Sequence, residues 1–327
     1  MSSFSDKIYT FITETMEATS FEEIEVIQTL WSGYGKIKRL QVTGCNENTV
    51  VVKHIQLNDT VTHPRGWNTN ISHLRKTKSY QVECDWYQNW SDKCSQLCRV
   101  PKCYGFLEKE GETLIILEDI DSAGFPLRLH NINQTRFHAC IRWLANFHAT
   151  FLYSKPQKLW PIGTYWHLDT RPDEFAALDD LALKNAARAI NDTLNASPFK
   201  TIVHGDAKIA NFCFAENEND VAAVDFQYTG GGVGVKDLAY FVGSCLGERE
   251  AERQENDILE YYFQQLEIAL QEKISPATFK RLQKNWHELY YFAWADFHRF
   301  LKGWNPGHWK INGYSERITK TVIDSLN

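Results

Sequence analysis

The sequence contains no run of the roughly 20 consecutive apolar residues that a membrane-spanning helix requires, so no membrane span is expected. It has no excess of positive charge, because 35 lysines and arginines face 41 aspartates and glutamates, giving a net charge of −6. A global basic field for nucleic acid is therefore not expected. The first residues carry early charges and no continuous apolar segment, so no signal peptide is expected.

Repeats and low-complexity tracts are also lacking, and the 327 residues are long for one core and suit two lobes. Eight cysteines without a secretory signal indicate reduced thiols in a cytoplasmic protein. Cys94, Cys98 and Cys103 lie close together in the sequence, but their spacing fits no common zinc pattern. Buried thiols are therefore the preferred interpretation of this group.

The stretch Thr201–Gln227 predicts a small β-ribbon. Short β-branched or aromatic segments bounded by turn residues predict three strands, at Ile202–Val203, Asn211–Phe214 and Val221–Phe226. Folding this ribbon brings Asp206, Asn211 and Asp225 to one end, where two carboxylates and an amide oxygen would suit Mg²⁺. Lys208 lies where a cation could meet a γ-phosphate.

The first part of the chain predicts an amphipathic helix over residues 4–16 and then a largely antiparallel five-stranded sheet. Its strands are expected within 25–44, at 49–55, 100–106 and 113–119, with a helix inserted over 71–91. Gly33 and Gly35 could let backbone amides approach a phosphate, or could form a plain hairpin turn. Lys53 and Glu83 are either solvated flank residues or the two partners of a buried ion pair.

The second part is expected to be mostly helical, with a domain boundary after Asp119, so that the domains comprise residues 1–119 and 120–327. Gly230–Val235 is interpreted as a flexible loop, followed by a helix with Asp237 in its first turn. Several aromatic residues near the C-terminus could be core residues or could line a substrate pocket, namely Trp286, Tyr290, Trp294, Trp304 and Trp309.

Several motifs occur together in a fixed order. H-G-D-x-x-x-x-N at 204–211 and V-D-F at 224–226 resemble the small-molecule phosphotransferase branch of the protein-kinase-like superfamily, which includes aminoglycoside phosphotransferases and choline kinases. The chain is most similar to the ecdysteroid-kinase-like family in its L-E-D-I, S-Y-x-V-E-x-x-W-Y, D-F-Q and D-L-A-Y-F segments. The resemblance implies an α+β, bilobal protein-kinase-like fold, with a small N-terminal sheet and a larger helical lobe carrying the catalytic ribbon.

For the ribbon, the resemblance implies that Asp206 is the catalytic base that accepts the proton of the substrate hydroxyl. Asn211 and Asp225 would hold Mg²⁺. Asp237 would steady the loop that carries Asp206.

For the nucleotide, the resemblance implies that Lys53 binds the α- and β-phosphates of ATP and is fixed by Glu83. Glu118 and Ile120 would belong to the hinge whose backbone meets adenine. Gly33 and Gly35 would belong to the phosphate loop.

The sequence departs from the wider pattern at three positions. Gly205 stands where protein kinases have arginine, Gln227 replaces the glycine after Asp-Phe, and Lys38 stands where a third loop glycine would fall. The first two favour an ATP-dependent kinase acting on the hydroxyl group of a small molecule. The alternatives are a choline- or aminoglycoside-type kinase, or a catalytically silent nucleotide-binding pseudokinase.

Overall fold

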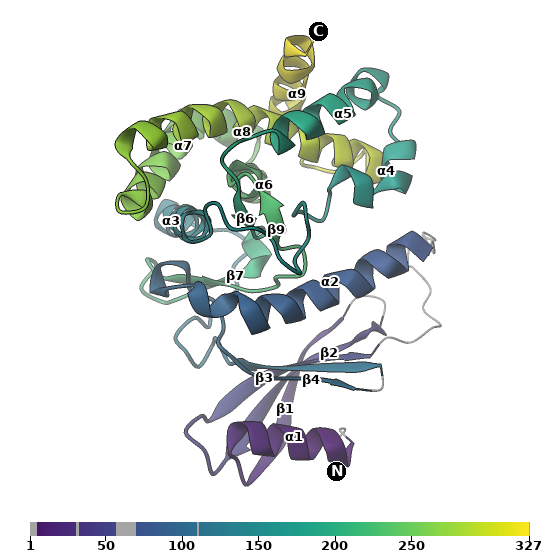
Figure 1. Ribbon diagram of the computed structural model, residues 1–327. Coiled ribbons are helices and arrows are strands. Elements are labelled where there is room, and N and C mark those ends of the chain that lie inside the picture. The colour runs from purple at the N-terminus through teal and green to yellow at the C-terminus, as the bar shows by residue number, and fades with distance from the viewer. Residues whose placement is uncertain (1–4, 31–32, 57–69, 110, 327) are drawn as a thin grey trace.

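A computed structural model describes residues 5–30, 33–56, 70–109 and 111–326. The N-terminal lobe is built on a five-stranded antiparallel sheet in the order β1-β2-β3-β5-β4 (Figure 1). Its strands are β1 (Ser20–Thr29), β2 (Gly35–Thr43), β3 (Thr49–Gln56), β4 (Cys103–Lys109) and β5 (Glu112–Glu118). The predicted sheet is confirmed, although β1 begins at Ser20 rather than within the predicted range.

Helices cover both faces of this sheet, which explains why β3 is a nearly continuous run of β-branched residues. Val50 and Val52 face α1 (Asp6–Met16), whose apolar side packs against them. The alternate residues of the sheet face α2 (Asn70–Asn89), which lies between the sheet and the helical lobe (Figure 1). A strand covered on both sides buries successive side chains and therefore loses its polar alternation.

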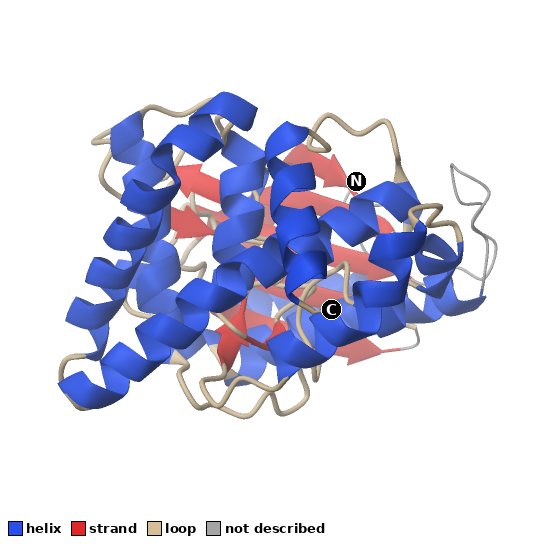
Figure 2. Ribbon diagram, turned by 90° about the horizontal axis from the view of Figure 1, so that it is seen from above, coloured by secondary structure: helices blue, strands red, loops and turns tan. Residues whose placement is uncertain are grey.

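The second lobe is mainly helical, as predicted, and its helices cover the strands when viewed from that side (Figure 2). They are α3 (Gln134–Thr150), α4 (Pro172–Ala176), α5 (Leu181–Asn195), α6 (Val235–Cys245), α7 (Glu248–Leu270), α8 (Pro276–Trp304) and α9 (Gly313–Ser325). Side-chain caps fix several of their beginnings. Asn133 accepts from the Arg136 N–H at the start of α3, and Ser275 caps α8 directly before Pro276.

Short 3₁₀ helices complete the connections, at η2 (Ser91–Lys93), η3 (Gln96–Cys98), η4 (Leu168–Thr170) and η5 (Ile209–Asn211). One apolar core runs from α2 and β5 into the helices of the second lobe. This core crosses the boundary expected after Asp119, and the division into two domains stays a prediction. No helix in the described part of the chain is both long enough and apolar enough to cross a membrane.

Two small antiparallel pairs form the ribbon region. β7 (Phe212–Phe214) pairs with β8 (Val221–Ala223), while β6 (Thr201–Val203) pairs with β9 (Gly230–Gly232). The prediction of a flexible loop over 230–235 is therefore wrong. A Cβ on Gly230 would lie 2.3 Å from the Trp160 carbonyl oxygen, so glycine serves close packing here.

Candidate active site

Asp206 lies in the loop after β6, and three donors hold its buried carboxyl group. Tyr240 donates its hydroxyl to Oδ1 at 3.0 Å, and Lys208 Nζ lies 2.8 Å from Oδ2. The Asn211 amide donates to the Asp206 carbonyl at 2.8 Å and to Oδ2 at 3.1 Å. These bonds bring together Asp206, Lys208 and Asn211 and fix the direction in which the carboxylate points.

Asp237 holds the backbone of the same loop from the first turn of α6. Its Oδ2 accepts from the His204 N–H at 2.6 Å, and its Oδ1 accepts from the Gly205 N–H at 2.9 Å. His148 Nε2 lies 3.1 Å from Oδ2, and its Nδ1 lies 2.8 Å from the Tyr262 hydroxyl. Asp237 is fully buried, so both backbone donors depend on this carboxylate rather than on water.

The residue before Asp206 is glycine for a local steric reason. Gly205 has φ +80°, and an added Cβ would lie 2.1 Å from the Tyr228 carbonyl oxygen and 2.9 Å from the Thr164 nitrogen. No side chain fits that space without moving backbone, and positive φ is unfavourable for other residues. The loop therefore excludes the arginine that protein kinases carry at this position.

His204 links the Asp206 loop to the strand that leads to Asp225. Its Nδ1 lies 3.3 Å from the Asp206 amide nitrogen, and its Nε2 lies 3.1 Å from the Val224 carbonyl oxygen. These partners assign the neutral tautomer with hydrogen on Nε2, because an amide can only donate and a carbonyl can only accept. The imidazole thus sets the spacing between the two halves of the ribbon.

The carboxylate of Asp225 lies near positively charged lysines, and its buried Oδ1 has no hydrogen-bond partner among the described residues. Burial raises the pKa of the Asp225 carboxyl, but the charges of Lys53 and Lys208 overcome this effect and hold the pKa below its ordinary value. Asp225 also adopts φ +70°, a conformation that few residues other than glycine, asparagine and aspartate favour.

Asn211 presents the second oxygen. Its Nδ2 is committed to Asp206, and no described residue donates to its Oδ1. This oxygen and the unpartnered Asp225 Oδ1 are the hard ligands that Mg²⁺ prefers. The described residues contain no group of three or more His, Cys, Asp or Glu side chains that could hold a metal ion. A magnesium ion here would therefore need phosphate and water ligands as well.

Lys53 and Glu83 form a buried ion pair between β3 and α2. Lys53 Nζ lies 2.6 Å from Glu83 Oε2, and both side chains are almost fully buried. Burial lowers the pKa of Lys53, but the carboxylates of Glu83 and Asp225 outweigh it and hold the pKa above its ordinary value. Of the two interpretations that the sequence allows, the structure contains the buried pair and not the solvated flank.

The residues after Asp225 attach the ribbon to α2. The Phe226 ring stacks on Trp86 with ring centroids 4.5 Å apart. Lys76 donates to the Gln227 side-chain oxygen at 2.7 Å, and Ser79 Oγ lies 3.3 Å from the same oxygen. Gln227 therefore connects the lobes through its amide, a contact that glycine could not make.

The predicted hinge follows β5. The Glu118 carboxylate forms an ion pair with Arg99, so this side chain is already engaged within the protein. The Ile120 carbonyl accepts from the Phe125 N–H at 3.0 Å, while the Ile120 N–H has no acceptor among the described residues. A backbone donor is thus left at the position where the resemblance implies adenine.

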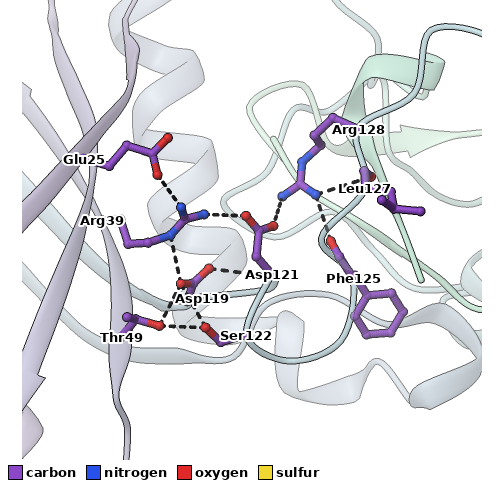
Figure 3. A network of polar contacts seen from close by, with 9 residues as sticks. All are labelled: Glu25, Arg39, Thr49, Asp119, Asp121, Ser122, Phe125, Leu127 and Arg128. Atoms are coloured by element: carbon purple, nitrogen blue, oxygen red, sulfur yellow. Dashed lines mark hydrogen bonds and ion pairs between the residues drawn. The ribbon is translucent and has the colours of Figure 1, made fainter. Parts of the chain in front are cut away.

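A charged network fixes this hinge to both lobes (Figure 3). Arg39 on β2 pairs with Glu25, Asp119 and Asp121, and its Nε lies 2.9 Å from Asp119 Oδ2. On the other side, Arg128 donates to Asp121 Oδ1 at 2.6 Å. The network joins the sheet, the hinge and the start of the helical lobe in one chain of contacts. Of these residues, the sequence points only to Asp119, as part of the L-E-D-I segment and the end of the first predicted domain.

Gly33 lies between β1 and β2 and Gly35 is the first residue of β2, and both have positive φ. A Cβ on Gly35 would meet the His54 carbonyl oxygen at 2.0 Å, whereas Gly33 has open space around its Cα. Lys38, at the position of a third loop glycine, pairs with Glu23 at 2.8 Å. Phosphate binding by the two glycines stays a prediction, and Trp31 and Ser32 lie outside the described residues.

A cavity of about 380 Å³ opens beside Asp206 and has a largely aromatic wall. Of the C-terminal aromatic residues, Trp304 lines it, whereas Trp286 and Tyr290 are fully buried core residues. The sequence analysis missed Tyr240 and Lys310, which also line this cavity. Tyr240 could have been found, because it lies one helical turn after Asp237 and so shares its face of α6.

The sequence model of the ecdysteroid kinase-like family matches residues 46–159 and 163–273. The chain belongs to the ecdysteroid kinase-like family. The matched residues include Lys53, Glu83 and the whole ribbon, so the predicted family is confirmed from both parts of the chain. A search of curated proteins found no matching sequence.

Solved structures of small-molecule kinases are weakly similar to this member of the family. A microcompartment-associated aminopropanol kinase has 12% identity and a TM-score of 0.48, with 98% of this chain and 94% of that chain covered. A Plasmodium vivax ethanolamine kinase has 13% identity and a TM-score of 0.48, with 94% and 83% covered. A Streptomyces rimosus aminoglycoside phosphotransferase, solved with ADP and streptomycin, has 11% identity and a TM-score of 0.45, with 88% and 99% covered. The family assignment rests on the sequence match.

Proposed function

We propose that this protein is an ATP-dependent kinase that transfers the γ-phosphoryl group to a hydroxyl of a small molecule. The observation that supports the proposal is that Asn211 holds Asp206 at 3.1 Å, while Lys208 interacts with the charges of both Asp206 and Asp225. The buried Lys53–Glu83 pair stands close enough to influence Asp225. Phosphoryl transfer depends on positioning and charge rather than on covalent catalysis, and this site supplies both.

Asp206 is the proposed catalytic base. As the acceptor oxygen forms its bond to the γ-phosphorus, the hydroxyl proton moves to the Asp206 carboxylate and the bond to the bridging oxygen of ADP breaks. The hydrogen bond from Tyr240 at 3.0 Å keeps one carboxylate oxygen in place. Lys208, which lies 2.8 Å from the other oxygen, is the proposed contact of the γ-phosphate.

Asn211 and Asp225 are the proposed ligands of Mg²⁺. The unpartnered Asp225 Oδ1 and the free Asn211 Oδ1 support this assignment. When bound, Mg²⁺ would neutralise part of the charge on the β- and γ-phosphates. The low pKa of Asp225 keeps its carboxyl group ionised and ready for a cation at neutral pH.

Lys53 is the proposed contact of the α- and β-phosphates, held in position by Glu83 at 2.6 Å. The free N–H of Ile120 is the proposed donor to the adenine ring.

All eight cysteines are free thiols, which supports the predicted reducing, cytoplasmic environment.

The test is turnover of ATP with a panel of hydroxyl compounds, followed by detection of ADP and the phosphorylated product. Asp206→Asn should lower kcat by about a hundredfold or more with any accepted compound, because general-base catalysis contributes on that order. Asp257→Asn, on the exposed side of α7, is the matched control and should leave kcat unchanged.

Full turnover by Asp206→Asn would refute the assigned base. Binding of ATP and Mg²⁺ without turnover across the panel would favour the pseudokinase alternative.

A further inference from the structure

The cavity beside Asp206 is lined by more positively charged than negatively charged side chains. Its lining includes two lysines, Lys208 and Lys310, against the single carboxylate of Asp206 among the described residues. Asp206 is already paired with Lys208 at 2.8 Å. The ammonium group of Lys310 therefore has no matching carboxylate among the described residues that line this cavity.

Lys310 belongs to the segment between α8 and α9, and its ammonium group lies against aromatic rings. Nζ is 4.7 Å from the centroid of the Tyr240 ring and 5.5 Å from that of Phe297. No carboxylate of the described residues forms an ion pair with it. Burial lowers the pKa of Lys310 to about 8, although the charge of Asp206 opposes this effect. An ammonium group in such a setting gains from any negative group that enters the cavity.

This arrangement disfavours a cationic acceptor. Aromatic rings in a pocket can bind an ammonium ligand through their faces, but here the protein's own Lys310 lies over Tyr240 and Phe297. An amine entering the cavity would meet like charge from Lys310 and Lys208, with the neighbouring carboxylate already neutralised. Like charges at short range are destabilising, and more so where water is excluded.

We propose that Lys310 is a specificity-determining residue that binds an oxyanion group of the acceptor. The acceptor class is a hydroxyl compound with an apolar body and a carboxylate, sulfate or phosphate group. The inference rests on the proposed kinase function for the identity of the cavity as the acceptor site. The apolar body would pack against Phe297, Leu301 and Trp304, which supply the non-polar part of the wall.

The test uses three matched naphthalene compounds that share a hydroxymethyl group and differ at one position: a carboxylate, a methyl group or an aminomethyl group. Their binding is measured by calorimetry, and their turnover with ATP and Mg²⁺ is measured separately. The carboxylate compound should bind best and the amine worst. A charge-assisted contact of this kind corresponds to a preference of about tenfold or more.

Three variants of Lys310 separate its charge from its shape. Lys310→Met should remove the preference for the carboxylate compound. The Kd and KM of that compound should rise about tenfold, with little change for the methyl compound. Lys310→Arg should keep the preference, and Lys310→Glu should reverse it in favour of the amine. Lys280→Met, on an exposed position of α8, is the matched control and should behave as the wild type.

The inference is overturned if the amine binds as well as the carboxylate compound, or if none of the three binds. It is also overturned if Lys310→Met lowers kcat equally for every accepted compound, since Lys310 would then serve the phosphoryl group instead. The kinase proposal can fail on its own, because an absence of turnover would not change the order of affinities measured by calorimetry. A carboxylate preference without phosphorylation of any hydroxyl compound in the panel would support the oxyanion site and count against the kinase.

Discussion

Replacing Asp237 with asparagine should loosen the loop that carries Asp206. The carboxylate accepts from two buried backbone donors, at 2.6 Å from His204 and 2.9 Å from Gly205. Asparagine offers one oxygen and turns an NH₂ group towards the other donor. Leaving one buried N–H unsatisfied costs about 1–3 kcal/mol, and losing the negative charge weakens the remaining bond. The expected loss is about 2–4 kcal/mol of unfolding free energy.

That loss can be measured as a change in melting temperature. Unfolding entropy near 2.1 cal/mol/K per residue gives about 0.7 kcal/mol/K for 327 residues, so the melting temperature should fall by about 3–6 °C. Asp257→Asn, an exposed substitution of the same type, should change it by less than about 1 °C. With an accepted hydroxyl compound, kcat should also fall at least about tenfold, because small displacements of catalytic groups are costly. An Asp237→Asn protein with the same melting temperature as the wild type would refute this account of the loop.

Three further changes test neighbouring parts of the structure. Gly205→Ala should lower the free energy of unfolding, measured in urea, by about 2 kcal/mol or more, because its Cβ would meet the Tyr228 carbonyl at 2.1 Å; an unchanged urea midpoint contradicts this. Glu83→Ala should cost about 3–5 kcal/mol in the same assay, since it leaves Lys53 buried and unpaired; a loss below about 1 kcal/mol would mean that Lys53 finds another partner. Burial and the charge of Lys236 lower the pKa of His167 from 6.5 to about 4 in the folded protein. As pH falls, His167 is therefore protonated first in the unfolded chain, and stability falls between pH 6.5 and 4. The loss at pH 5 should be roughly 2 kcal/mol by urea unfolding, and His167→Gln should show a shallower pH dependence; an equal slope would contradict the assignment.

The elements that the sequence predicts correctly are those whose signals are local. The β-branched run around Lys53 and the aromatic face around Glu83 each indicate one element, and the ion pair follows once the two elements pack together. The family motifs add the order of the elements. This combination suffices for the sheet, for α2 and for the presence of β7 and β8, although β8 ends at Ala223 rather than at the predicted Phe226.

Features that depend on distant packing could not be read in the same way. Gly230–Gly232 has the composition of a loop, and its pairing with β6 follows from the close approach of Trp160. Lys310 lies about a hundred residues after Asp206, in an irregular segment without a periodic pattern. Its place in the cavity wall is set by how α8 and α9 pack, which no local signal reveals.

The central claim is that the ribbon binds ATP together with Mg²⁺. The most direct test is calorimetric titration of the wild type and Asp225→Asn with ATP, each with and without Mg²⁺. Asparagine tolerates the positive φ of 70° at this position, so the variant should fold. Mg²⁺ should raise ATP affinity at least about tenfold in the wild type and much less in Asp225→Asn, because the variant lacks one charged ligand. No ATP binding by the wild type, or an equal Mg²⁺ effect in both proteins, would contradict the account.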